Sequence, residues 1–156
     1  MRRRKAEKKD VLPDPKYKSK LVAKFINNMM YDGKKMVAES IVYSAFEILE
    51  KKTQEENALK VFNKAIENVR PRLEVKARRL GGSTYQVPIE VPVNRSNALA
   101  MRWLRDFARK KKGRPMDVKL ADELLVAYKG EGAAVKKRDD THKMAESNKA
   151  FSHLRW

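Results

Sequence analysis

The chain has 156 residues, of which 42% are hydrophobic and 37% charged, and it carries a formal net charge of +17. This length and hydrophobic fraction indicate one folded domain and exclude a fully disordered chain, while the charge favours a polyanionic partner such as nucleic acid. The lack of cysteine excludes disulfides and thiolate metal sites, and His142 and His153 have no acidic residues at a metal-binding spacing, so no metal and no cofactor are expected.

The chain begins with a basic extension. Residues 1–20 contain nine Lys and Arg against three Asp and Glu, with few apolar residues. We therefore expect residues 1–18 to form an arm that becomes ordered on a polyanion, followed by a helical domain over residues 19–156. No apolar run follows the basic start, and no stretch approaches the ~20 apolar residues of a membrane span, so the sequence predicts a cytoplasmic protein with no membrane partner.

Residues 19–70 have the apolar periodicity of three helices. For the first helix, Ser19 is the candidate N-cap and Gly33 the candidate stop. Thr53 and Glu56 have the spacing of a capping box at the start of the third helix. The expected core positions are Leu21, Val22, Phe25, Ile26, Met29, Met30, Val37, Ile41, Val42, Ala45, Ile48, Leu49, Leu59, Phe62, Ala65, Ile66 and Val69.

The charge pattern separates a structural segment from two binding segments. Residues 35–70 contain six basic and six acidic residues, so we interpret them as a structural helical hairpin that ends at Pro71. Residues 71–114 contain twelve basic and three acidic residues. Together with residues 1–20 they hold nearly all of the excess positive charge, which predicts two binding segments.

Between residues 72 and 91 the apolar period changes to two on both sides of Gly81-Gly82, which predicts a β-hairpin. Two strands alone are marginal in water, so the hairpin should project as an arm or rest on RNA, although its base could equally pack on the core. Its tip combines Arg78 and Arg79 with Tyr85, a composition that favours RNA contact through phosphate pairing and base stacking.

Three further helices are predicted after the hairpin. Ser96 is the candidate N-cap of a fourth helix that runs to about residue 111, with Trp103, Leu104 and Phe107 facing the core. A fifth helix runs from Met116 and ends near Gly130. A sixth covers about 133–148, and its basic face could be a solvated, salt-bridged surface as readily as an RNA contact. The cations opposite the core on the fourth helix are Arg95, Arg102, Arg105, Arg109 and Lys112.

Catalytic patterns are missing. Gly33-Lys34-Lys35 lacks the other residues of a P-loop, and Gly81-Gly82 precedes a strand, so neither is expected to hold a nucleotide. Acidic residues lie mainly among basic residues at helical spacing, which indicates ion pairs. His142 is more readily a phosphate or ribose contact, or a surface residue, than a proton shuttle. No enzymatic activity and no small-molecule substrate are therefore predicted.

Five stretches resemble one known family. These are LPDPKY (12–17), KFINNMMYDGKK (24–35), GGSTYQVPIEV (81–91), ALAMRWL (98–104) and HKMAESNKAFSHLRW (142–156). They are similar to the bacterial form of small-subunit ribosomal protein seven, and the resemblance covers nearly the whole chain. It implies a mainly α, six-helix single domain with a protruding two-stranded β-hairpin and a basic N-terminal extension, which the periodicity also predicts.

The resemblance implies a function. Such a protein would bind the 3′ major domain of 16S ribosomal RNA, nucleate assembly of the 30S head, and lie near the decoding centre, the exit-site tRNA and the mRNA exit path, beside ribosomal proteins nine and eleven. The candidate RNA-binding residues are Arg2, Arg3, Arg4, Lys5, Lys8, Lys9, Lys16, Lys18, Lys20, Lys24, Asn27, Lys34, Lys35, Arg72, Lys76, Arg78, Arg79, Tyr85, Arg95, Arg102, Arg105, Arg109, Lys110, Lys111, Lys112, Arg114, Lys136, Lys137, Arg138, His142 and Lys143.

Two other classes of protein are compatible with the charge. A histone-like DNA-architectural protein would prefer duplex DNA to structured ribosomal RNA in a competition assay. A subunit of an RNA-modifying enzyme would show turnover with an RNA substrate.

Overall fold

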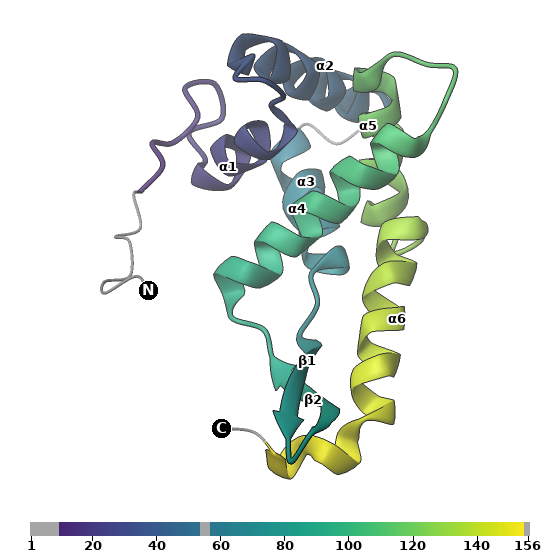
Figure 1. Cartoon of the computed structure of the whole chain (residues 1–156). Helices are drawn as coiled ribbons and strands as arrows, with labels where there is room; N and C mark the ends of the chain where they lie inside the picture. The colour runs from purple at the N-terminus through teal and green to yellow at the C-terminus, as the bar shows by residue number, and fades with distance from the viewer. Residues whose placement is uncertain (1–9, 54–56, 155–156) are drawn as a thin grey trace.

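The computed structural model describes residues 10–53 and 57–154, which form a helical domain with a β-hairpin (Figure 1). The mainly α class with one two-stranded hairpin is confirmed, and a short 3-10 helix, η1, follows the six predicted helices in this part of the chain. The elements are α1 (Lys20–Met29), α2 (Lys35–Thr53), α3 (Ala58–Val69), β1 (Leu73–Leu80), β2 (Ser83–Glu90), α4 (Val93–Lys110), α5 (Met116–Tyr128), α6 (Ala133–Ser147) and η1 (Lys149–Leu154).

The core lies among the six α-helices: α5 packs against α2, α3 and α4, and α6 contributes Ala134 and Val135. The Phe25 and Phe46 rings both lie against Phe62, with centroid distances of 5.1 and 5.2 Å. One predicted core residue is wrong: Val37 is 56% exposed and Ala38 is buried in its place. The buried stripe of α2 runs through Ala38, Val42, Ala45, Phe46 and Leu49, and Val37 lies about 100° away from Ala38 around the helix.

The N-cap of α1 is confirmed, but its predicted end is wrong. The Ser19 hydroxyl accepts a hydrogen bond from the Val22 N–H at 3.5 Å. The helix ends at Met29 because Met30 leaves the helical conformation, with φ −59° and ψ 139°. Gly33, at φ +73°, instead lies in the turn that leads to α2.

Two other predicted caps are wrong because α3 begins at Ala58 and α4 at Val93, away from the predicted cap residues. Thr53 is the last residue of α2 and donates its hydroxyl hydrogen bond to the Leu49 carbonyl at 2.8 Å, while Glu56 lies outside the described residues. Asn57 caps α3 instead, accepting from the Leu59 N–H at 3.0 Å. Ser96 is buried within α4, where its hydroxyl donates to the Pro71 carbonyl at 2.8 Å.

The predicted hairpin is confirmed, with Gly81-Gly82 as its turn and Leu80 paired with Ser83. It extends from the helical domain on the same side as α6, so that β1 packs on α6 and β2 on η1 (Figure 1). Val87 of β2 is fully buried although it lies outside the main core. The hairpin therefore projects from the first five helices but is supported along its length by the C-terminal elements.

Part of the expected N-terminal arm packs on the helical domain. Asp14 is 3% exposed, and its carboxylate accepts hydrogen bonds from the Lys16 and Tyr17 backbone N–H groups and from the Tyr43 hydroxyl. Burial raises the pKa of the Tyr43 hydroxyl, and its hydrogen bond to Asp14 raises it further. The Tyr17 ring packs edge-on against Phe46. These contacts bind the chain around Asp14 to α2.

No helix among residues 10–53 and 57–154 is long and apolar enough to cross a lipid bilayer.

Candidate RNA-binding surface

The predicted arginine stripe of α4 is divided by its contact with α1. Arg105 Nη1 donates hydrogen bonds to the Asn28 carbonyl at 3.2 Å and to the Asn28 side-chain oxygen at 2.9 Å. Arg109 Nη2 donates to the Met29 carbonyl at 3.0 Å. Carbonyls in the last turn of a helix lack partners within that helix, and positive charge there is favourable. Arg105 and Arg109 thus hold α4 against the C-terminal end of α1.

Arg102 is placed differently. It is exposed and forms no ion pair with any residue that the structure describes. Nearer the start of α4, Asn94 and Asn97 line a shallow cavity of about 190 Å³ together with Lys24 and Asn28 of α1. We name Lys24, Asn28, Asn94 and Asn97 the α1–α4 edge. It presents one cation and three amides on two helices that are fixed to each other, which suits contact with phosphates and exposed base edges.

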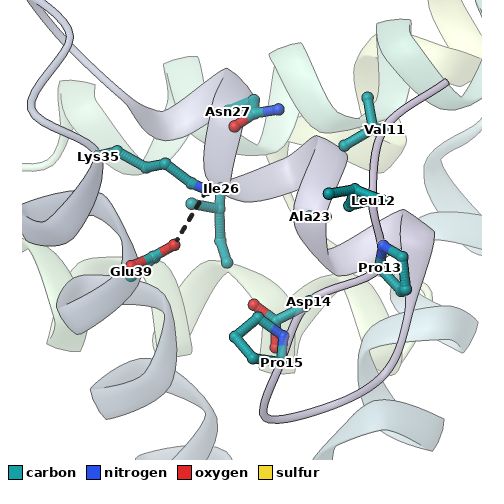
Figure 2. A pocket seen from close by; sticks show the side chains of 10 residues that line it. All are labelled: Val11, Leu12, Pro13, Asp14, Pro15, Ala23, Ile26, Asn27, Lys35 and Glu39. Carbon is teal, nitrogen blue, oxygen red and sulfur yellow. Dashed lines mark ion pairs between the residues drawn. The ribbon is translucent and has the colours of Figure 1, made fainter. Parts of the chain in front are cut away.

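A second cavity, of about 370 Å³, lies between the N-terminal segment, α1 and the start of α2 (Figure 2). Ala23 and Ile26 contribute apolar surface, and Asn27 lies at one side. Lys35 is paired with Glu39 at 3.5 Å, and the Asp14 carboxylate also lines the cavity, so the charges here do not favour a phosphate. Two of the predicted RNA-binding residues, Asn27 and Lys35, are therefore brought together here.

The turn between α1 and α2 carries an aromatic residue that the sequence analysis missed. Tyr31 is 69% exposed, and the Arg109 guanidinium carbon lies 5.7 Å from the centre of its ring. The predicted contact Lys34 lines the same shallow hollow as Tyr31. An exposed aromatic ring beside cations is a common platform for an unpaired base. The sequence signal that could have identified Tyr31 is its position between the end of a predicted helix and the Gly33-Lys34-Lys35 turn.

The predicted hairpin residues lie in different environments. Lys76 and Arg79 are exposed, whereas Arg78 is half-buried and has interactions within the chain. The Tyr85 ring, proposed for base stacking, already lies 5.4 Å from the Phe151 ring of η1. Arg95 Nε donates to Glu74 Oε1 at 2.8 Å, and this hydrogen bond raises the arginine pKa.

The segment between α4 and α5 pairs two predicted RNA contacts with acidic residues of α5. Lys111 Nζ lies 2.6 Å from Glu123 Oε2, and the glutamate is only 3% exposed. Arg114 pairs with Asp122 at 3.1 Å, and Lys52 of α2 pairs with the same carboxylate at 2.6 Å. The Lys52 hydrogen bond lowers the pKa of Asp122. These pairs hold α5 between α2 and the end of α4.

The remaining predicted residues fall into groups by their environment. Arg2, Arg3, Arg4, Lys5, Lys8 and Lys9 lie outside the described residues. The predicted cations with an ion pair are Lys16, Lys20, Lys35, Arg95, Arg105, Lys111, Arg114 and Arg138. Lys110 lies over the Phe107 ring. Those that are exposed and lack an ion pair within residues 10–53 and 57–154 are Lys18, Lys24, Lys34, Arg72, Lys76, Arg79, Arg102, Lys112, Lys136, Lys137 and Lys143.

Comparison with known proteins is decisive for the family. Residues 1–149 match the model of the family described as ribosomal protein S7p/S5e. The chain is 58% identical over 155 residues to the small ribosomal subunit protein uS7 of Francisella tularensis subsp. holarctica (strain OSU18), with 99% of each chain covered. It is 57% identical, with the same coverage, to the protein of that name from Francisella tularensis subsp. novicida (strain U112).

The chain belongs to the ribosomal protein S7p/S5e family. It is accordingly a structural protein of the small ribosomal subunit and not an enzyme, and RNA binding and a role in translation follow from its family. The described residues of this S7p/S5e chain contain no group of three or more His, Asp or Glu residues arranged to hold a metal ion.

Arg102 and Arg105 of this S7p/S5e chain should respond differently to the same substitution. Arg102→Gln is expected to make the slope of log affinity for ribosomal RNA against log salt less negative by about 1, with an unchanged melting temperature, because it removes one phosphate contact. Arg105→Gln is expected to lower the free energy of unfolding by roughly 1–3 kcal/mol, because the partly buried hydrogen bonds from Arg105 to the carbonyl and side-chain oxygens of Asn28 are lost. Filter binding over a salt series and urea unfolding measure the two effects. An Arg102→Gln protein with an unaltered salt slope would show that this arginine faces solvent.

Proposed function

We propose that this chain binds 16S ribosomal RNA directly, in its 3′ major domain, and nucleates assembly of the 30S head. The observation that carries the proposal is the α1–α4 edge, where the exposed Lys24 lies beside three asparagine amides on a fixed helical frame, together with the exposed Arg102 elsewhere on α4; neither cation has an ion pair among the described residues. Family membership supplies the ribosomal setting, in the cytoplasm.

The proposed mechanism is the neutralisation of RNA phosphates by cations that are held on a rigid helical frame. Each exposed cation that pairs with a phosphate releases condensed counterions, so the affinity should fall steeply as salt rises. The contacts of Arg105 with Asn28, of Lys111 with Glu123 and of Arg138 with the Asn68 carbonyl fix the helices that carry the exposed cations. Because the frame is held without RNA, little conformational entropy is lost when phosphates from separate RNA helices are drawn together.

We further propose that the hairpin side of the molecule lies near the decoding centre, facing the exit-site tRNA and the mRNA exit path, with ribosomal proteins nine and eleven as neighbours. The hairpin and α6 extend together from one side of the helical domain, at the far end from α2 (Figure 1). Arg79 and Lys76 on the hairpin and Lys143 on α6 are exposed there. This arrangement separates a primary RNA-binding edge from a second basic surface.

A competition experiment tests the proposal. Labelled RNA of the 3′ major domain is bound to the full chain and displaced by unlabelled RNA of the same domain, by 5′-domain ribosomal RNA of equal length, or by duplex DNA of equal charge. The cognate RNA should compete at least roughly a thousandfold better than the DNA, the usual ratio of specific to non-specific binding. Preferential displacement by the duplex would instead identify a histone-like DNA-architectural protein. Hydroxyl-radical footprinting on the same complex then maps the protected nucleotides.

A further inference from the structure

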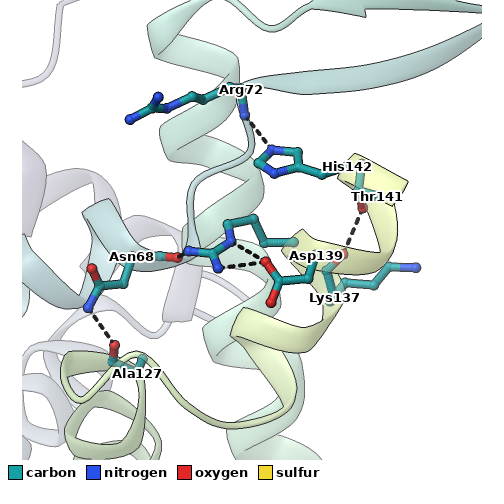
Figure 3. A network of polar contacts seen from close by, with 8 residues as sticks. Asn68, Arg72, Ala127, Lys137, Asp139, Thr141 and His142 are labelled. Carbon is teal, nitrogen blue, oxygen red and sulfur yellow. Dashed lines mark hydrogen bonds and ion pairs between the residues drawn. The ribbon is translucent and has the colours of Figure 1, made fainter. Parts of the chain in front are cut away.

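A hydrogen bond joins the base of the hairpin to α6. The backbone N–H of Arg72, the residue immediately before β1, donates to His142 Nε2 at 2.9 Å (Figure 3). Because Nε2 accepts here, it carries no proton, and the His142 ring is neutral with its proton on Nδ1. The Arg72 guanidinium points away from this contact (Figure 3).

One turn earlier on α6, Arg138 fixes the helix that bears His142. Its Nη1 donates to the Asn68 carbonyl at the end of α3, and its Nε donates to Asp139 Oδ1 at 2.8 Å. The Asn68 side-chain amide donates in turn to the Ala127 carbonyl at 2.9 Å, near the end of α5 (Figure 3). The ends of α3 and α5 thereby share one polar network with α6, and helix-end carbonyls that lack partners within their helices are satisfied.

The other end of the hairpin is held by η1. The Tyr85 and Phe151 rings lie 5.4 Å apart, and Val87 between this contact and the base is fully buried. Two separate contacts, one at the base and one near the tip, restrict the direction of the hairpin more than either contact would alone.

We propose that His142, supported by Arg138, is a positioning residue that fixes the direction in which the hairpin leaves the helical domain, so that the hairpin meets its RNA partner already ordered. The proposal rests on the proposed RNA-binding function. It assigns His142 and Arg138, which the sequence pattern places on the RNA-binding surface, to the support behind that surface. An arm ordered before binding loses less conformational entropy when it binds.

Protonation of His142 removes the acceptor and adds a positive charge. Burial lowers the pKa of His142, the nearby Arg138 and Arg72 guanidinium groups lower it further, and Asp139 opposes them. The folded protein thus favours the neutral ring. The contribution of the bond to stability is complete above the ordinary histidine pKa of ~6.5 and is lost as the pH falls from there through the lowered pKa. Hairpin order should follow the same pH dependence.

The chain contains no cysteine, so two spin labels can be placed at will. Asn63→Cys on α3 and Ser83→Cys at the hairpin turn are exposed positions that report the distance between the domain and the hairpin. Pulsed electron paramagnetic resonance on the full chain should give one narrow distance distribution at pH 7.5 that broadens as the pH falls below the ordinary histidine pKa of ~6.5. His142→Ala should broaden it at every pH. His142→Gln, whose side-chain oxygen can accept the Arg72 hydrogen bond, should restore the narrow distribution and abolish its pH dependence. His153→Gln, a change of the chain's other histidine, is the matched control and should leave the titration unchanged.

RNA binding separates this proposal from the function on which it rests. His142→Ala should weaken binding of 16S RNA by about 2- to 3-fold, the lower end of the range of one net hydrogen bond, and His142→Gln should restore it. If His142→Ala weakens RNA binding while the distances stay narrow, the histidine contacts RNA directly and the positioning role is wrong. If neither His142 variant nor Arg102→Gln changes RNA binding, the proposed function fails even where the distances behave as expected. If the His142→Ala protein loses its helical circular dichroism signal, it has not folded. The His142→Gln variant and the pH titration of the unaltered chain then test the proposal.

Discussion

A chain that lacks residues 2–9 is expected to bind 16S ribosomal RNA at least roughly a hundredfold more weakly at low salt, because six cations leave with few other residues. The slope of log affinity against log salt should become less negative by up to ~5, the counterion release of six phosphate contacts. The melting temperature should change by less than ~2 °C, since Met1 and Ala6 are the only apolar residues among the first nine. Filter binding over a salt series and thermal circular dichroism measure both quantities.

A second variant distinguishes charge from chain length. Replacing the same six cations by glutamine keeps all residues and should reproduce the loss of affinity and of salt slope. If the glutamine variant binds normally while the deletion does not, the backbone of the segment and not its charge is required. A fall of ~5 °C or more in the melting temperature of the deletion would show that the segment stabilises the folded domain. The deletion stops before Asp10, so the ion pair between Asp10 and Lys20 is retained.

The order and type of the helices could be predicted because their burial repeats with the helical period. Phe25, Phe62 and Ile66 sit at such positions, and their burial needs no knowledge of the partner helix. The caps were less predictable because a hydroxyl can bond either to its own helix or to a distant carbonyl. Ser96 illustrates this: its hydroxyl bonds to Pro71, 25 residues away in sequence. No local pattern contains that partner.

The candidate site could be predicted by composition but not residue by residue. Arg102 and Arg105 are the same residue type three positions apart on α4, yet one is free and the other holds α1. Which arginine contacts α1 depends on where the last carbonyl groups of α1 lie, and tertiary packing sets their position. Similarly, Lys111 reaches the buried Glu123, an acidic residue that the sequence pattern offered no reason to bury. Charge counts therefore identify binding segments, while the pairing within them requires the fold.

The hairpin and its support were also predictable to different degrees. Alternating residues around Gly81-Gly82 predict both strands and their turn. The 3-10 helix η1 has six residues and is too short for a periodic signal. Without η1 the aromatic Tyr85 looks available for a base, whereas the structure places Phe151 against it.

Shortening the hairpin is expected to affect ribosome function far more than primary RNA binding. The strand register pairs Ala77 with Gln86, so residues 78–85 can be replaced by Asn-Gly, a two-residue turn that preserves the pairing of Lys76 with Val87. Val87 and the bond from Arg72 to His142 then stay in place. The variant should fold and bind naked 16S RNA within about threefold of the full chain, since the N-terminal segment and the α1–α4 edge are untouched.

The deficit should appear in assembled subunits. Reassembled ribosomes with the shortened hairpin should retain exit-site tRNA several-fold less well, because the tip cations Arg78 and Arg79 are missing from the proposed contact with tRNA and mRNA. Phe151→Ala in the full-length hairpin removes the ring contact with Tyr85 but keeps the tip cations, so a smaller loss of tRNA retention is expected from it than from the shortened hairpin. Filter binding and tRNA retention can be measured on one preparation. If affinity for naked RNA collapses while tRNA retention in the subunits that form is normal, the tip is a primary anchor, and the proposed division between the helical frame and the hairpin is wrong.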